Sequence, residues 1–214
     1  MAKPSDDILW ALAHAERAAL AEDLAGLSTE QWHHDTLCGQ WDVEHVVAHL
    51  TAAASTNQSQ WLRSMLGARF RPAVHNQRRL QERLGATPAE TLERFRAVIR
   101  SKIAPTSDTA AYLGEVLVHA QDIRHPLGLA HLPSIDALTP VAEFFAQRNF
   151  AVPSRSRAAG LQLQADDGPF AAGTGPLVTG PTLALVMAMA GRGAYLEDLQ
   201  GPGVETLRSR IEGS

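Results

Sequence analysis

The chain lacks several features that whole classes of protein need. Its single cysteine, Cys38, excludes an internal disulfide and an all-cysteine metal site. The longest apolar run, residues 183–190, is far shorter than the roughly 20 residues that span a bilayer. The first residues show no basic segment, apolar block and small-residue cleavage site of the kind that marks a signal peptide. We therefore expect a cytoplasmic protein with no membrane partner.

An excess of positive charge is also absent. The net charge is −4 and the isoelectric point about 6.1, so no overall field attracts nucleic acid. Arginines do gather locally, at Arg69, Arg71, Arg78, Arg79 and Arg83 and again at Arg94, Arg96 and Arg100. Aromatic residues hardly interleave with them, so we expect no nucleic-acid partner. A solvated helix face is the ordinary interpretation of this cluster, and steering of an anionic small molecule is the alternative.

The first two-thirds of the chain show apolar residues at helical spacing. We expect helices at about residues 5–26, 42–61, 72–103 with an interruption at Gly85, 108–124 and 139–145. Asp42 is expected to cap the second helix, and Thr87-Pro88 to restart the third. The fourth helix is expected to stop at His125, because a residue before proline disfavours helical angles. Short loops between such helices indicate an up-and-down bundle.

The pattern changes after Pro153. Residues 154–157 are polar and predict a linker. Residues 161–165 alternate between apolar and polar and end in a turn signal, which predicts a strand. A second strand is expected at residues 177–179, followed by an apolar helix from Pro181 to Gly191.

These patterns predict an α+β fold, with an up-and-down four-helix bundle in residues 1–150 and a small α/β C-terminal domain in residues 158–214. So small a domain buries little surface alone, so we expect it to pack on the bundle.

The fourth helix carries the strongest chemical signal. Glu115 is its only acid between Asp108 and Asp122, and His119 lies one turn later on the same face. Bundles commonly build metal sites from such inward-facing groups, with a further ligand from another helix. His49, at the edge of the second helix's apolar stripe, is the best placed of the other histidines. Two histidines with one carboxylate are typical of catalytic zinc. On spacing alone, a surface Glu115–His119 ion pair beside a core His49 stays open as the alternative.

Three segments resemble the mycothiol-dependent maleylpyruvate isomerase family, which belongs to the DinB-like superfamily of metal-binding helical bundles. They are WDVEHVVAHL at residues 41–50, LGEVLVHAQDIRHPLG at residues 113–128, and the G-x-G-P-x-x-x-G-P pattern at residues 173–181 with its apolar helix. The resemblance implies a DinB-like bundle, a divalent metal, most simply zinc, held by His49, Glu115 and His119, and mycothiol as thiol cosubstrate. The chain departs from the family at His125, where a second arginine is frequent.

Four other residues are candidates for the site. Asp122 either orients a ligand histidine or forms a helix-end salt bridge, and Asp122 and Arg124 are both candidates for cofactor binding. Arg192 either clamps a substrate carboxylate, as a catalytic residue, or complements the end of the apolar helix. Cys38 is a fourth ligand or redox switch, or, as free cysteines usually are, a small buried hydrophobe.

The function that the resemblance implies is activation of a small thiol for addition to an unsaturated carbonyl compound, giving cis–trans isomerisation. The partners are then a small thiol and a small unsaturated acid or electrophile, and the protein is a monomer or homodimer. A mycothiol S-transferase that detoxifies electrophiles is the first alternative. A non-catalytic metal- or ligand-binding module and a metal-dependent hydrolase are the others.

Overall fold

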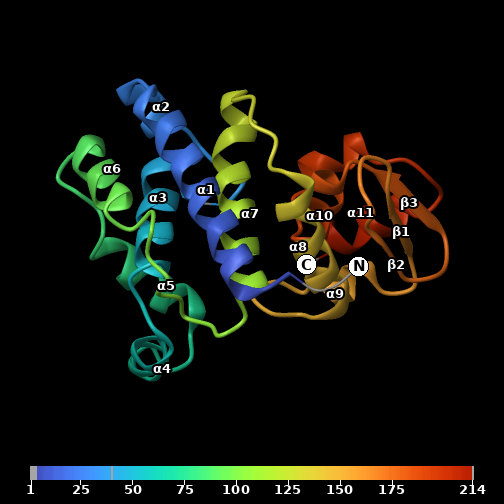
Figure 1. The fold of residues 1–214 in the computed structure, drawn as a ribbon, viewed down its shortest axis with the longest axis horizontal. Helices are drawn as coiled ribbons and strands as arrows, with labels where there is room; N and C mark the ends of the chain where they lie inside the picture. The colour runs from blue at the N-terminus through green and yellow to red at the C-terminus, as the bar shows by residue number, and fades with distance from the viewer. Residues whose placement is uncertain (1–3, 40, 214) are drawn as a thin grey trace. The chain divides into compact units, whose positions relative to one another are not determined.

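The computed structural model describes residues 4–39 and 41–213 and shows helices with one small sheet (Figure 1). The chain forms two compact units, one from Asp6 to His131 and one from Leu132 onward that also includes Pro4 and Ser5. The first unit contains α1 (Asp6–Ala25), α2 (Thr29–Trp32), α3 (Val43–Ala53), α4 (Gln58–Gly67), α5 (Pro72–Gln81), α6 (Pro88–Arg96) and α7 (Thr109–Leu127). The second contains α8 (Ile135–Gln147), α9 (Ser154–Ala158), β1 (Gln162–Ala165), β2 (Ala171–Ala172), β3 (Leu177–Gly180), α10 (Thr182–Met189), a 3₁₀ helix (Gly193–Asp198) and α11 (Val204–Glu212). The predicted class, a helical bundle followed by a small α/β part, is confirmed.

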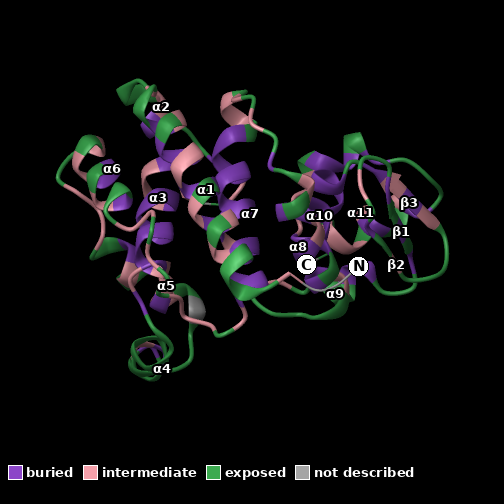
Figure 2. Ribbon diagram, viewed as in Figure 1, coloured by how far each residue is buried: buried purple, intermediate pink, exposed green. Residues whose placement is uncertain are grey.

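The first unit is built around α1, α3 and α7. Helix α1 runs along α7, and α3 packs against α5, α6 and α7. Figure 2 shows the sides of these helices that face one another as buried. Leu20 and Leu24 of α1, Val47 of α3, Phe95 of α6 and Ile123 of α7 meet in one apolar core. Helical periodicity in the sequence predicts such apolar faces on these helices.

The second predicted helix is in fact two. Asp42 caps α3 through the backbone N–H of His45, as expected. The helix ends at Ala53, because Ser55 and Thr56 turn their hydroxyls back to the carbonyls of the preceding turn. Asn57 then starts α4 with its own capping box. Trp61, the last residue of the helix expected over residues 42–61, is exposed.

Helix α7 runs past the point at which we expected it to stop. It continues through Pro126 to Leu127 and ends on Gly128, whose φ of 63° lies in the left-handed region. Proline cannot donate to the carbonyl of Asp122, one turn earlier. The backbone N–H of Leu37 takes its place at 3.1 Å. The proline is therefore tolerated, and it ties the segment before α3 to α7.

The second unit holds a three-stranded sheet in the order β2-β1-β3. Strands β1 and β3 run parallel, with Leu163 opposite Val178, and β2 pairs with β1 antiparallel. Helix α10 is buried along its whole length, which agrees with its uniformly apolar sequence. Both predicted strands and this helix are present, whereas β2 and α11 were not predicted.

The boundary between the units differs from the predicted one. Helix α8 packs on α10, so the division falls at Leu132 and not between residues 150 and 158. Ser134 caps α8 through Ala137, so the helix begins before the predicted start at Thr139. Residues 154–157, predicted as a linker, belong to the short helix α9, in which Ser154 and Arg157 are buried. Packing of the small C-terminal domain on the bundle stays a prediction.

Within residues 4–39 and 41–213, we find no helix with the length and apolarity that crossing a membrane requires.

Arg17 of α1 joins three parts of the first unit. It is only 1% exposed, and one of its terminal nitrogens donates to the carbonyls of Val98, Ile99 and Ser101. The other donates to the hydroxyl of Tyr112 on α7 at 2.5 Å. Burial raises the pKa of Tyr112 to about 12, so the phenol stays protonated at neutral pH. One guanidinium therefore binds the segment after α6 to α1 and also fixes α1 against α7.

Replacing Arg17 with methionine is expected to lower the free energy of unfolding by about 3 kcal/mol, because several buried acceptors lose their donor at once. Chemical denaturation monitored by circular dichroism measures this loss. The matched control is Arg155→Met, a change at an exposed arginine, which should cost less than about 0.5 kcal/mol. Equal stability of the two variants would contradict the structural role of Arg17.

Candidate metal centre

Helices α3 and α7 bring together the three residues predicted as metal ligands. Nε2 of His49 lies 2.7 Å from Oε1 of Glu115, and Nε2 of His119 lies 3.5 Å from the same oxygen. One donor atom from each residue lies within 4.8 Å of the other two. The one-turn spacing of Glu115 and His119 on α7 and the packing of α3 on α7 produce this arrangement. The three residues are thus one cluster and not a separate ion pair and core histidine.

Trp41 forms a wall of this cluster that the sequence analysis did not identify. Its ring centroid lies 4.9 Å from that of His49 and 6.5 Å from that of His119. The two imidazoles meet edge to face at 4.9 Å. The available signal was the position of Trp41 directly before Asp42, the N-cap of the helix that carries His49. An aromatic ring there limits how either imidazole can rotate.

Asp122 fixes the orientation of His119. Its Oδ2 lies 2.9 Å from Nδ1 of His119, and its side chain is fully buried. With Nδ1 bound to a carboxylate, Nε2 is the nitrogen that faces Glu115. This is the geometry of the orienting carboxylate behind many metal-binding histidines.

The cluster favours positive charge. Burial raises the pKa of Glu115, but the two histidines beside it, His119 foremost, outweigh burial and hold that pKa well below its usual range. Burial lowers the pKa of His119, yet Glu115, Asp122 and Cys38 hold it well above its ordinary value. The carboxylates that stabilise a charged His119 also favour a cation between the donor atoms.

Cys38 lies beside His119 but outside the three-residue cluster. Its sulfur can share a ligand group with His119 and Asp122, not with His49 and Glu115. The residue is half-buried and packs against the apolar core of the first unit. Cys38 therefore has a packing role and a contact with the ring of His119, while ligation or redox chemistry stays a prediction.

Arg124 takes a structural position. Its side chain is wholly buried, with Nε donating to Asp23 at 2.7 Å and one terminal nitrogen 3.6 Å from Glu16. Both acids belong to α1, so this pair joins α1 to α7. The contacts of Arg124 give no support to the predicted cofactor-binding role.

The donor set fits a divalent metal ion. Two imidazole nitrogens and one carboxylate oxygen are the ligands of many catalytic zinc sites, with further positions left for exchangeable ligands. The orienting Asp122 supplies the outer layer that such sites usually have. Glu115 keeps 27% of its side chain exposed, so the cluster can be reached from outside.

Comparison with known proteins agrees with this geometry. Residues 13–109 match the model of the mycothiol maleylpyruvate isomerase N-terminal domain. The match covers 97 of the 214 residues and falls within the first unit, so it is this unit that is similar to the family's domain. The matched residues include His49, whereas Glu115 and His119 follow them on α7. Comparison with curated proteins gives no match.

Two solved structures have the same fold over nearly the whole length. One is a crystal structure of the mycothiol-dependent maleylpyruvate isomerase, with a TM-score of 0.62 and 14% identity. The other is a mutant of that enzyme in which a histidine is replaced by alanine, with a TM-score of 0.61 and 15% identity. In both comparisons the match covers 93% of each chain.

Arg192, the residue predicted to bind a substrate carboxylate, lies in the second unit shortly after the end of α10. One of its terminal nitrogens donates to the carbonyl of Ala190 at 2.9 Å. Arg157 is its neighbour, and the guanidinium of Arg157 lies against the backbone of Gly191, whose φ of 95° disfavours any residue with a side chain. The helix-end contact is therefore present, and the substrate role stays a prediction.

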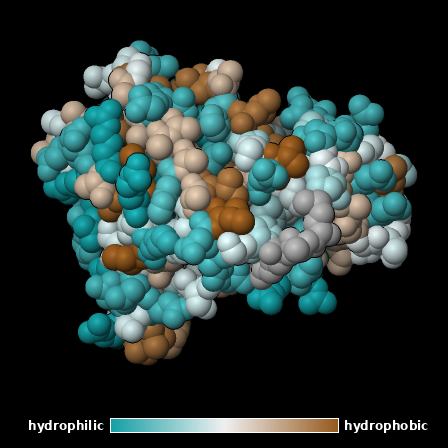
Figure 3. All heavy atoms as spheres, viewed as in Figure 1, coloured by the Kyte–Doolittle hydropathy of each residue, from teal (hydrophilic) through white to brown (hydrophobic). Residues whose placement is uncertain are grey.

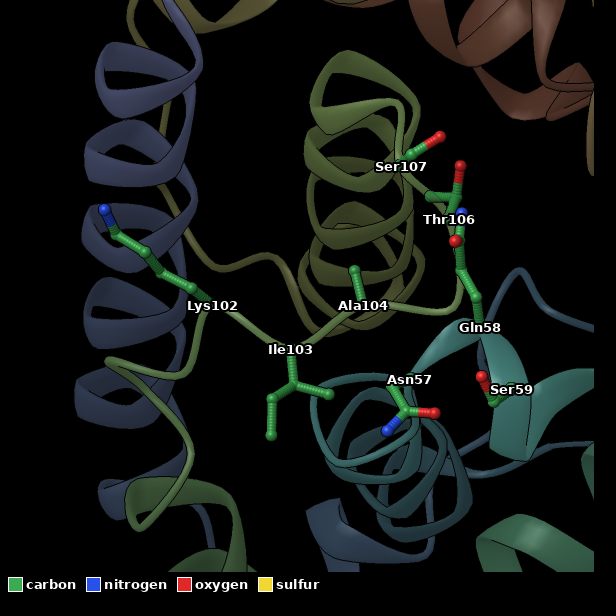
Figure 4. Close-up of a pocket in the computed structure, with 8 residues that line it drawn as sticks. All are labelled: Asn57, Gln58, Ser59, Lys102, Ile103, Ala104, Thr106 and Ser107. Carbon is green, nitrogen blue, oxygen red and sulfur yellow. The ribbon is translucent and has the colours of Figure 1, made fainter.

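A surface pocket of about 390 Å³ lies elsewhere in the first unit (Figure 4). It is lined by Asn57, Gln58 and Ser59 at the start of α4 and by Lys102, Ile103, Ala104, Thr106 and Ser107 before α7. None of the cluster residues contributes to it. We assign it no part in the metal chemistry.

The cluster predicts near-stoichiometric divalent metal in the purified protein. Replacing His119 with alanine should remove most of it, because one of three ligands is lost. Replacing Asp122 with asparagine should weaken binding about tenfold to hundredfold, since the orienting charge disappears. The control is His45→Ala, because His45 binds Asp42 at the start of α3 and lies outside the cluster. The metal content per chain is measured by elemental analysis after dialysis. An equal metal content in the wild type and in His119→Ala would refute the assignment.

Proposed function

We propose that this protein is a metal-dependent enzyme that uses a small thiol, of the maleylpyruvate isomerase type. The observation that carries the proposal is the convergence of two imidazoles and one partly exposed carboxylate from α3 and α7. The match of residues 13–109 to the family's N-terminal domain and the shared fold with a mycothiol-dependent isomerase support it. They also make mycothiol our choice of thiol.

His49, Glu115 and His119 would hold the ion, for which zinc is the simplest choice by donor type. When bound, such an ion supplies a Lewis acid that favours the thiolate form of a thiol. The surrounding residues of the chain have separate tasks. Asp122 keeps Nε2 of His119 directed at the site, and Trp41 packs beside the rings of both histidines.

The substrate class follows from the chemistry of thiolates. A thiolate adds to a double bond conjugated to a carbonyl group, and the new single bond can rotate. Expulsion of the thiol then completes a cis–trans isomerisation, as from maleylpyruvate to fumarylpyruvate. Release of the adduct instead completes an S-conjugation. The donor set serves both outcomes equally, so the S-transferase that removes electrophiles is our second candidate.

A non-catalytic metal- or ligand-binding module is the candidate from a different class. The partly exposed Glu115 favours an enzyme, because a structural metal site is normally closed by four protein ligands. A bound ion that keeps no exchangeable water would favour the module instead. Hydrolysis by the same centre would show as turnover without any thiol.

The deciding experiment is an assay of the metal-loaded protein with maleylpyruvate and simple electrophiles, each with several low-molecular-weight thiols including mycothiol. We expect turnover that requires both metal and added thiol. Cys38→Ser should keep more than about half of it, since Cys38 lies outside the ligand cluster and the reacting thiol comes from solution. Loss of all turnover in a folded, metal-loaded Cys38→Ser protein would make Cys38 the nucleophile or a ligand.

Arg192→Ala tests the second unit's part in the reaction. If the guanidinium binds a substrate carboxylate, its loss should raise KM for an anionic substrate roughly tenfold to hundredfold and leave metal content unchanged. An uncharged electrophile should be affected little. The control is Arg155→Ala, at an exposed arginine of the same unit. Unchanged kinetics with the anionic substrate would leave Arg192 with only its contact to the end of α10.

A further inference from the structure

Large apolar side chains are exposed on α4 and in the turn that follows it. Leu62, Leu66 and Phe70 follow one another at four-residue intervals, with Trp61 beside the first, and their exposure ranges from 38% to 63%. Met65, one turn after Trp61, is the buried residue of α4. Figure 3 shows hydrophobic atoms gathered at α4 among hydrophilic neighbours. We call these four residues the α4 stripe.

The backbone is strained where the α4 stripe ends. Arg69 and Phe70 have φ values of 53° and 55°, in the left-handed region that side chains other than glycine's rarely adopt. Hydrogen bonds from their N–H groups to Leu66 and Met65 hold this turn. Non-glycine residues persist in such angles only where the surrounding structure requires them, and often at functional sites. The strain presents Phe70 to solvent, where it contributes nothing to the core.

Positive charge surrounds the α4 stripe. Residues 57–83 contain six arginines and one acid, Glu82, in a chain whose net charge is −4. Arg79 pairs with Glu82, and the other five (Arg63, Arg69, Arg71, Arg78 and Arg83) form no ion pair with any described residue. Arg78 donates to the carbonyl of Gly67 at the end of α4, so charge and stripe share one surface. The partner of this surface should therefore be anionic and able to bury apolar side chains.

We propose that the α4 stripe and its arginines dock the protein on an anionic lipid surface. A short convex helix with tryptophan and leucine on one side and arginines at its edge has the character of an interfacial helix. A second copy joined by a twofold axis is disfavoured, because it would place the same arginines against one another. Our expectation of no membrane partner rested on the lack of a long apolar run, which excludes spanning a bilayer but not lying on one.

The test is co-sedimentation of the full-length protein with vesicles of phosphatidylcholine, with and without phosphatidylglycerol. We expect binding only to the anionic vesicles, and we expect it to weaken as salt is added. Arg69→Gln combined with Arg71→Gln should weaken binding by about fivefold per arginine. Leu66→Ser combined with Phe70→Ser should weaken it by at least about tenfold. The tryptophan fluorescence shift on binding should disappear in Trp61→Phe.

Two control variants distinguish vesicle binding through the α4 stripe from non-specific vesicle binding. Leu132→Ser changes a leucine that is 83% exposed outside the stripe, and Arg155→Gln removes an exposed charge from the second unit. Both should bind vesicles as the wild type does. No binding by the wild type, or equal binding by the stripe variants, would overturn the proposal. So would a wild-type dimer that Leu66→Ser with Phe70→Ser makes monomeric, because the stripe would then be a contact between copies.

Discussion

One carboxylate shared by two imidazoles across a helix interface is the interaction on which the candidate centre depends. Glu115 contacts a histidine from its own helix and one from α3, so its position is useful only while α3 and α7 keep their register. A charged group held inside a bundle is costly unless partners surround it. Here the partners and the register come from the same packing. The apolar stripes of α3 and α7 therefore set the chemistry as well as the fold.

The register has its own supports. Arg17 holds Tyr112, one turn before Glu115, and Arg124 holds Asp23 on α1, so α7 is fixed at both ends of the cluster. Asp122 connects two features at once. Its side chain orients His119, and its carbonyl, which Pro126 cannot use, accepts the N–H of Leu37. The segment that carries Cys38 and Trp41 is thereby held beside the histidines.

The sequence predicted what depends on local pattern. Helical periodicity located α1, α3 and α7, and one-turn spacing located Glu115 and His119. It missed features that depend on distant partners. Pro126 predicts the end of a helix, unless it is known that the N–H of Leu37 replaces the donor that proline lacks. Arg124 is a plausible ligand-binding residue, unless its burial against α1 is known. Trp41 lies in the segment 41–50 that resembles the family, but its position beside both imidazoles is seen only in the folded chain.

The break after α3 shows how a short polar stretch decides two properties together. Had α3 continued through residue 57, the periodicity would have turned Trp61 towards the core with the rest of its stripe. Ser55 and Thr56 instead bond back to the last turn, and Asn57 starts a new helix at a different angle. Leu62, Leu66 and Phe70 face water in the folded protein, and they would also do so in an uninterrupted helix, because helical rotation places them away from the buried stripe of α3. The break therefore decides the exposure of Trp61, whereas the exposure of the other three follows from their positions in the sequence.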